Sequence, residues 1–196
     1  LARFLLLFES VKAKGSFLDN KRVIVTAAPH QSGKDEYLMI LMILALDIDV
    51  CYLSAKWTMR RIPIPFIKPK DIDNQGIPWP LGWLQEIVFR KFGAIPVDRK
   101  GNSGQYDSVV QELFKRDSFL LIITPEGRFD ATRFRSSFLY LAKELEAEVM
   151  PVQIDYEHDT LQFLNSLNLD GSEEEVIQRL RSCFDGVKGR KSRFKA

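Results

Sequence analysis

Four short, almost uninterrupted apolar runs constrain the fold of this 196-residue chain more than any other feature. They are rich in β-branched and aromatic residues and cover residues 22–28, 49–54, 118–124 and 148–154. Continuous hydrophobicity over such lengths is typical of strands that are covered on both faces. The stretches between them favour helix, at residues 34–46, 81–92, 106–115 and 134–145. This alternation predicts an α/β fold, a single-domain sandwich with a mostly parallel central sheet flanked by helices.

The composition excludes several classes of protein. Apolar residues make up 45% of the chain and charged residues 28%, which suits a packed core and excludes a disordered or fibrous protein. The 28 basic and 26 acidic residues are too evenly balanced to imply a nucleic-acid partner. Two cysteines exclude a disulfide framework, and with only two histidines beside them they argue against a zinc site. We therefore expect no zinc site, and the reaction discussed below requires no bound cofactor.

The chain divides into three expected parts: an N-terminal helical segment at residues 1–22, a core at 23–156, and a C-terminal extension at 157–196. The longest apolar run, residues 38–46, is far shorter than the ~18 residues that a membrane-spanning helix needs. The extension ends in a basic tail, which is either a solvated terminus or a contact for anionic lipid. Its basic residues are Lys188, Arg190, Lys191, Arg193 and Lys195.

Residues 57–83 interrupt the alternation of strands and helices. They hold all three tryptophans and five of the nine prolines. Prolines this dense exclude a regular helix and a central strand, so we expect a long excursion over the surface. Basic and apolar residues alternate within it. The segment either binds a lipid surface or packs its aromatic side chains on the core of the domain, where they would cover the sheet or line an acyl pocket.

His30 directly follows the first predicted strand, and Asp35 lies five residues later, where a helix is expected to begin. Ligands in α/β proteins bind at the carboxyl ends of strands. A carboxylate in the first turn of that helix can orient the imidazole and leave its other nitrogen free as a general base. The same spacing also occurs where an aspartate only caps a helix. The other histidine, His158, lies among acidic residues and is expected to be exposed.

Residues 28–35 also approximate a phosphate-binding P-loop, which would indicate an NTPase. That pattern needs Gly at its first position and Ser or Thr at its last, where this chain has Ala28 and Asp35. The apolar run at residues 118–124 leads to Glu126 and not to the aspartate that would hold magnesium. These defects argue against an NTPase, which stays open as an alternative.

Three further blocks follow in the chain, at residues 92–99 (FGAIPVDR), 123–128 (ITPEGR) and 149–152 (VMPV). Together with His30 and Asp35, they resemble the glycerolipid acyltransferase superfamily, specifically small bacterial relatives of 1-acylglycerol-3-phosphate acyltransferase. The resemblance implies transfer of a fatty acyl group from acyl-CoA or acyl carrier protein to a hydroxyl of lysophosphatidate or another glycerophosphate-type acceptor. It implies His30 as the general base, Asp35 as its orienting partner, and Pro151 as the proline of the fourth block. Implied substrate-binding residues are Ser32, Gly93, Arg99, Glu126, Gly127 and Arg128.

The chain departs from the family pattern at two blocks. Pro29 stands where the family usually has Asn before the histidine. The third block lacks a Thr, so that its Arg comes one position early and Phe129 stands in the usual place of the Arg. Either the acceptor site is altered, or the anionic acceptor is bound by Arg128, Arg133 or Arg135. A non-catalytic lipid-binding relative with the same fold is a further alternative.

The chemistry of this reaction agrees with the residues present. Acyl transfer from a thioester needs a general base and an anion-binding Arg, but neither a metal nor a covalent intermediate. Backbone N–H groups near Gly33 or Gly127 are candidate donors to the oxyanion. Two of the implied substrate-binding residues also have purely structural interpretations: Arg99 as part of a surface ion pair, and Glu126 as a helix cap. The implied substrates are amphiphiles, so we expect a cytoplasmic protein attached peripherally to the inner face of the cell membrane.

Overall fold

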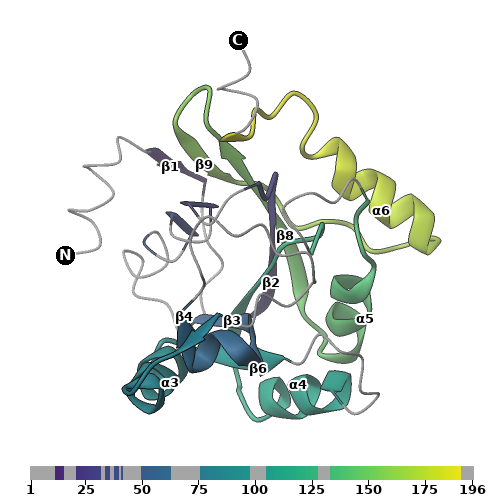
Figure 1. Ribbon diagram of the computed structural model, residues 1–196. Helices are drawn as coiled ribbons and strands as arrows, with labels where there is room; N and C mark the ends of the chain where they lie inside the picture. Colours follow the sequence, from purple (N-terminus) through teal and green to yellow (C-terminus); the bar gives the residue numbers. More distant parts are fainter. Residues whose placement is uncertain are drawn as a thin grey trace. The chain divides into compact units, whose positions relative to one another are not determined.

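The computed structural model describes residues 12–15, 21–31, 34–35, 38–39, 41, 50–62, 76–97, 105–127 and 133–190. It shows an α/β fold in which most strand pairs are parallel, as the alternating pattern predicts (Figure 1). The chain forms two compact units. The first consists of Leu1–Asp49 and Asp117–Ala196, and the second of Val50–Arg116.

Strand β2 (Arg22–Ala28) is the centre of the first unit. It pairs in parallel with β7 (Phe119–Ile123) on one side and with β8 (Glu148–Asp155) on the other. Residues 23–28 of β2 are all buried, which explains why the strand is apolar without alternation. On the far side of β8, β9 (Thr160–Phe163) runs antiparallel to it and pairs in parallel with β1 (Lys12–Lys14). The carboxyl ends of β2, β7 and β8 therefore meet at one edge of this sheet.

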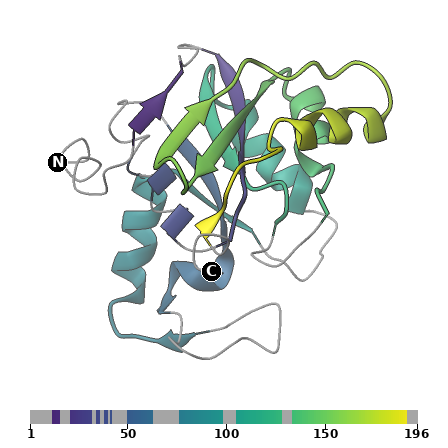
Figure 2. The ribbon, with the colours of Figure 1, turned by 90° about the horizontal axis from the view of Figure 1, so that it is seen from above.

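Two helices of the first unit lie side by side along one flank of the sheet, α5 (Ser137–Glu144) and α6 (Glu173–Ser182) (Figures 1 and 2). Helix α5 buries an apolar face that includes Phe138 and Leu141. Ser172 caps α6 through a capping box, and acidic residues fill its first turn, an arrangement that satisfies the backbone N–H groups at this end. The hydroxyl of Tyr140 in α5 donates to Glu173 in α6 at 2.6 Å.

The second unit contains strand β3 (Val50–Ala55), which pairs in parallel with β6 (Ala94–Val97). Between them the chain forms the 3-10 helix η1 (Lys56–Met59), the antiparallel pair β4 (Arg61–Ile62) and β5 (Ile77–Pro78), and helix α3 (Gly82–Lys91). Helix α4 (Gln105–Phe114) follows β6. Within residues 57–83, the described parts are thus short elements and the start of α3, and no described strand of this segment joins the sheet of β3 and β6.

The four predicted strands are confirmed as β2, β3, β7 and β8, and three predicted helices as α3, α4 and α5. In the predicted helix at residues 34–46, the described positions are helical and the others lie outside the described residues. Strands β1, β6 and β9 and helix α6 were not predicted. Strand β1 lies within residues 1–22, where we expected helix, because pairing with β9 outweighs local preference in so short a segment. The predicted domain boundaries at residues 22 and 156 remain predictions. Within the described ranges, no helix has the length and apolar character needed to cross a membrane.

Candidate active site

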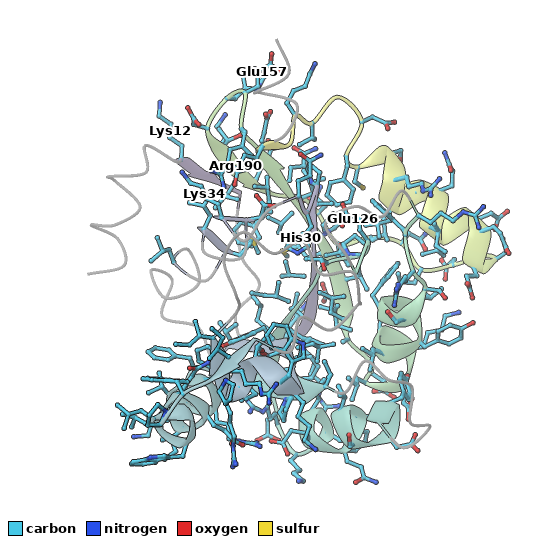
Figure 3. The ribbon with its side chains drawn as sticks, in the orientation of Figure 1. Lys12, His30, Lys34, Glu126, Glu157 and Arg190 are labelled. Carbon is cyan, nitrogen blue, oxygen red and sulfur yellow. The ribbon has the colours of Figure 1, made fainter. Side chains whose placement is uncertain are left out.

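His30 lies just beyond the carboxyl end of β2 and is almost fully buried, with 5% of its surface exposed. Its backbone N–H donates to Oε1 of Glu126 at 3.1 Å (Figure 3). Glu126 follows β7, the parallel neighbour of β2, so the sheet brings together two residues that lie 96 positions apart in the sequence. The third predicted block thus meets the first at the sheet edge where ligands of α/β proteins bind.

Asp35 is buried among three polar groups, with only 1% of its surface exposed. Its Oδ2 accepts a hydrogen bond from the backbone N–H of Gln31 at 2.7 Å and lies 3.7 Å from Nδ1 of His30. Its Oδ1 accepts a hydrogen bond of 2.5 Å from the hydroxyl of Tyr156. One carboxylate oxygen therefore both closes the turn after β2 and faces the imidazole. The capping interpretation and the orienting interpretation of this aspartate are compatible with each other.

The 3.7 Å separation of Nδ1 and Oδ2 is longer than the ~3.2 Å limit of an ordinary N–H···O bond. Contacts between catalytic groups are often long in the absence of substrate and shorten when it binds. The geometry directs Nδ1 towards the carboxylate. An imidazole that keeps its proton on that nitrogen presents Nε2 as the base.

The environment of Glu126 shifts the titration of its carboxyl. Burial raises the pKa of its carboxyl above the ordinary value, the negative charge of Asp35 adds to this rise, and the hydrogen bond from the His30 backbone opposes it. Its Oε2 is buried and has no hydrogen-bond partner among the described residues. Buried polar atoms are nearly always paired, so an unpaired carboxylate oxygen beside a histidine is well placed to accept a hydrogen bond from a ligand.

Arg135 reaches the turn that carries Glu126. Its backbone N–H donates to the carbonyl oxygen of Pro125 at 2.8 Å. A Cβ placed on Gly127 would lie 3.2 Å from Nε of Arg135, so the arginine side chain packs directly on this glycine. Gly127 also has a φ of +67°, which favours glycine. Of the three arginines proposed to contact the acceptor, Arg135 is therefore beside the third block, whereas Arg128 lies outside the described residues.

The other predicted site residues fall into two groups. Ser32 and Arg99 lie outside the described residues. Gly93 lies in the second unit, where its φ is +82° and a Cβ would lie 1.7 Å from the carbonyl oxygen of Val50. The packing of β3 thus requires a glycine at this position for structural reasons. The N–H of Gly127, a candidate oxyanion donor, already donates to the carbonyl oxygen of Thr124 at 2.9 Å, and this hydrogen bond closes the turn.

Sequence reasoning missed Tyr156, although one signal points to it. Tyr156 comes directly after β8, the other parallel neighbour of β2, and the carboxyl ends of both strands lie at the same edge of the sheet. Any polar residue at that position was a candidate for the cluster. His158, by contrast, is exposed as predicted, and its Nδ1 lies 2.7 Å from Asp155.

The described residues contain no group of three or more His, Cys, Asp or Glu side chains that could hold a metal ion. No protein family model matches the chain, and no curated protein matches it. The fold and the site define it as an α/β protein whose buried cluster of His30, Asp35, Glu126 and Tyr156 lies at the carboxyl ends of three parallel strands.

Proposed function

We propose that this chain is an acyltransferase of the glycerolipid type, in which His30 is the general base. The fatty acyl donor is acyl-CoA or acyl carrier protein, and the acceptor is lysophosphatidate or another glycerophosphate with a free hydroxyl. The observation that carries the proposal is the buried His30, whose Nδ1 faces Asp35 and whose backbone binds Glu126. The first and third sequence blocks, which supported the resemblance, supply these three residues.

The proposed reaction needs one base and no cofactor. Nε2 of His30 removes the proton of the acceptor hydroxyl, and the oxygen attacks the carbonyl carbon of the thioester. A C–O bond forms, the C–S bond breaks, and the proton passes from the imidazole to the departing thiolate. Asp35 keeps the other ring nitrogen protonated and stabilises the imidazolium that forms between these steps.

Glu126 and Arg135 fit complementary roles in binding the acceptor. The unpaired Oε2 of Glu126 is suited to accept a hydrogen bond from a glycerol hydroxyl. Arg135 packs against the turn that carries Glu126, and the planar guanidinium of an arginine binds a phosphate through two hydrogen bonds. Arg99, Ser32, Gly93 and Arg128 remain predictions for this site.

The hydrogen bonds after β2 favour acyl transfer over the NTPase alternative. A P-loop directs its backbone N–H groups at phosphate. Here the N–H of Gln31 donates to Asp35, and the N–H of His30 donates to Glu126. Two carboxylates therefore occupy the donors that a phosphate would need. A non-catalytic lipid-binding relative has no need for a histidine buried against two carboxylates, which favours the enzyme over this alternative as well.

We expect the purified protein to release thiol from palmitoyl-CoA or palmitoyl acyl carrier protein when lysophosphatidate is present. His30→Ala should reduce this rate by about 100-fold or more, because general base catalysis contributes ~10²–10⁴ in rate. Asp35→Asn should also reduce it strongly. The matched control is His158→Ala, which removes the only other imidazole and should leave turnover unchanged. Wild-type turnover in folded His30→Ala protein would exclude this mechanism.

Amphiphilic substrates require a route to the lipid, and the second unit offers an apolar surface with basic residues. Trp83, Leu84, Ile87 and Val88 form one exposed face of α3, and Trp83 exposes 57% of its surface. The described residues between 50 and 97 include five basic residues and one acidic residue, Glu86. Exposed apolar residues flanked by positive charge favour an anionic lipid surface. We therefore propose peripheral attachment to the inner face of the cell membrane through this face of α3.

A further inference from the structure

We propose that Tyr156 is a positioning residue that holds the Asp35 carboxylate in the orientation facing His30. This inference rests on the proposed function, because it assigns Tyr156 a role in the same site. Nothing in the sequence blocks includes this tyrosine, which lies 121 positions from its partner. Its hydroxyl donates to Oδ1 of Asp35 at 2.5 Å, and both side chains are buried.

The two oxygens of Asp35 have separate donors, and this fixes the rotation of the carboxylate. Tyr156 holds Oδ1, whereas the backbone N–H of Gln31 holds Oδ2. A carboxylate held at one oxygen can rotate about its Cβ–Cγ bond, since this terminal torsion is broad. Held at both, it keeps Oδ2 on the side of Nδ1 of His30. Without the tyrosine hydroxyl, Oδ1 would lose the 2.5 Å hydrogen bond from Tyr156, and the carboxylate would be less firmly held in this rotation.

The C-terminal segment in turn fixes both donors. The backbone N–H of Tyr156 donates to the carbonyl oxygen of Lys188 at 2.9 Å. Gly189 is buried and packs on Gln31 so closely that a Cβ would lie 2.4 Å from Oε1 of that side chain. Gly189, within the basic tail, therefore packs on Gln31, the residue whose N–H donates to Oδ2. Tyr156 thus occupies a fixed place between β8 and residues 188–189.

The test compares Tyr156→Phe with Tyr140→Phe as the matched control. Tyr140 is exposed, and its hydroxyl also donates to a carboxylate, that of Glu173, so the control removes the same group away from the site. We expect Tyr156→Phe to lower kcat by about 10-fold to 100-fold, the usual range for a residue that orients a functional side chain. The KM for either substrate should stay unchanged, because Tyr156 binds neither. Tyr140→Phe should change neither parameter.

A second measurement does not depend on activity. The chain has only two histidines, so ¹⁵N spectra of the imidazoles at pH 8 contain the signals of His30 and His158 alone. In the wild type, His30 should carry its proton on Nδ1. In Tyr156→Phe it should become a mixture of tautomers, whereas the signals of His158 stay where they were. Asp35→Asn should change the His30 signals similarly, and adding Tyr156→Phe to it should have little further effect.

The outcomes separate the two proposals. If His30 keeps its tautomer in Tyr156→Phe and kcat does not change, Tyr156 has no positioning role. If the tautomer changes but the wild type transfers no acyl group, the positioning role stands and the proposed function fails. If Tyr156→Phe does not fold, 3,5-difluorotyrosine can replace Tyr156 alone. This residue keeps the aromatic ring and changes the acidity of the hydroxyl that donates to Asp35. A shift of the His30 signals beyond those of His158 then supports the proposal, and its absence overturns it.

Discussion

At Glu126, burial disfavours the ionised form of the carboxyl and so lowers the stability of the folded protein. The residue exposes only 7% of its surface, and its Oε2 has no hydrogen-bond partner among the described residues. Desolvation raises the pKa of its carboxyl above the ordinary value of 4.5. A buried carboxyl with a raised pKa costs folding free energy when it is ionised, about 1.4 kcal/mol for each unit of difference. A buried, ionisable group whose burial lowers stability is typical of sites that bind a ligand.

Glu126→Gln should therefore stabilise the protein at pH 7 while lowering its activity. The amide can still accept the N–H of His30, but it carries no charge. Below pH 4.5 the carboxyl is protonated in both the folded and the unfolded state, so the variant should gain little there. The gain should grow as pH rises from 4.5 to the raised folded-state pKa, because the carboxyl of the unfolded wild type then ionises more readily than that of the folded wild type, and it should level off above that pKa. Urea unfolding across this pH range measures the difference.

Glu144→Gln is the control for this prediction, since Glu144 is an exposed carboxylate of α5 in the same unit. Glu144→Gln should have nearly the same free energy of unfolding as the wild type at every pH. A Glu126→Gln protein that is less stable than the wild type at pH 7 would show that the carboxylate has a stabilising partner, contrary to our account.

Arg135 and Arg133 offer a second matched pair at the scale of single residues. Both are exposed and two positions apart, but only Arg135 packs on Gly127. Arg135→Ala should raise the KM for lysophosphatidate by roughly tenfold or more, because a hydrogen bond to a charged group contributes about 1.5–3 kcal/mol. The KM for the acyl donor should change little. If Arg133→Ala shows the larger effect, the phosphate binds elsewhere than beside the third block.

Among the elements, helix α3 is rich in apolar residues that are not buried within the chain. Its only fully buried residue is Gly82, which approaches the carbonyl oxygen of Arg60, whereas large apolar side chains on the helix are exposed. Such a helix within a single chain usually marks an interaction surface. The aromatic segment at residues 57–83 was predicted to be either a lipid contact or a cover for the core. Trp79 donates to Gln85 at 2.7 Å and is partly buried, while Trp83 is exposed, so the described part of the segment contains both kinds of environment.

The proposed lipid contact predicts that the double variant Trp83→Ser, Ile87→Ser loses binding to vesicles that contain phosphatidylglycerol. Wild-type binding should require the anionic lipid, because the basic residues near α3 attract its head groups. It should weaken with salt, because salt screens this attraction. Phe114→Ser is the control, because Phe114 is as exposed as Trp83 but lies on α4. Co-sedimentation measures binding, and thermal unfolding checks that the fold is retained. Equal loss in both variants, or binding without anionic lipid, would contradict the proposal.

At the scale of the whole molecule, the strand whose bounds were predicted without error, β2, is the one whose residues are buried on both faces. Strand β2 has the bounds that its apolar run predicts, because every residue after Arg22 in it faces the interior. Strands β1 and β9 were missed, since they have three or four residues and their order in the sheet depends on distant partners. Short strands carry too few side chains for a pattern to emerge.

Spacing alone predicted the members of the candidate site that are close in the sequence, whereas Glu126, 96 positions from His30, was predicted only through the family resemblance. The spacing of His30 and Asp35 placed them together, and the structure agrees. The contacts to Glu126 and Tyr156 depend on which strands neighbour β2, and no local pattern encodes that order. Arg135 is placed beside the third block by its contacts with Pro125 and Gly127, which its position in the sequence does not indicate. Strand pairing, which the sequence does not show, brings Glu126 and Tyr156 to the site.

The pairing of β2 with both β7 and β8 has a consequence for synthesis of the protein on the ribosome. A nascent chain that ends before β8 already contains His30 and Asp35, but it lacks the tyrosine that holds the aspartate. Contacts between residues so far apart form only after the intervening chain has been made, and they form slowly. The Asp35 carboxylate therefore lacks its Tyr156 donor until translation has passed residue 156. Under the proposed function, this order keeps an unfinished polypeptide from reacting with acyl thioesters in the cell.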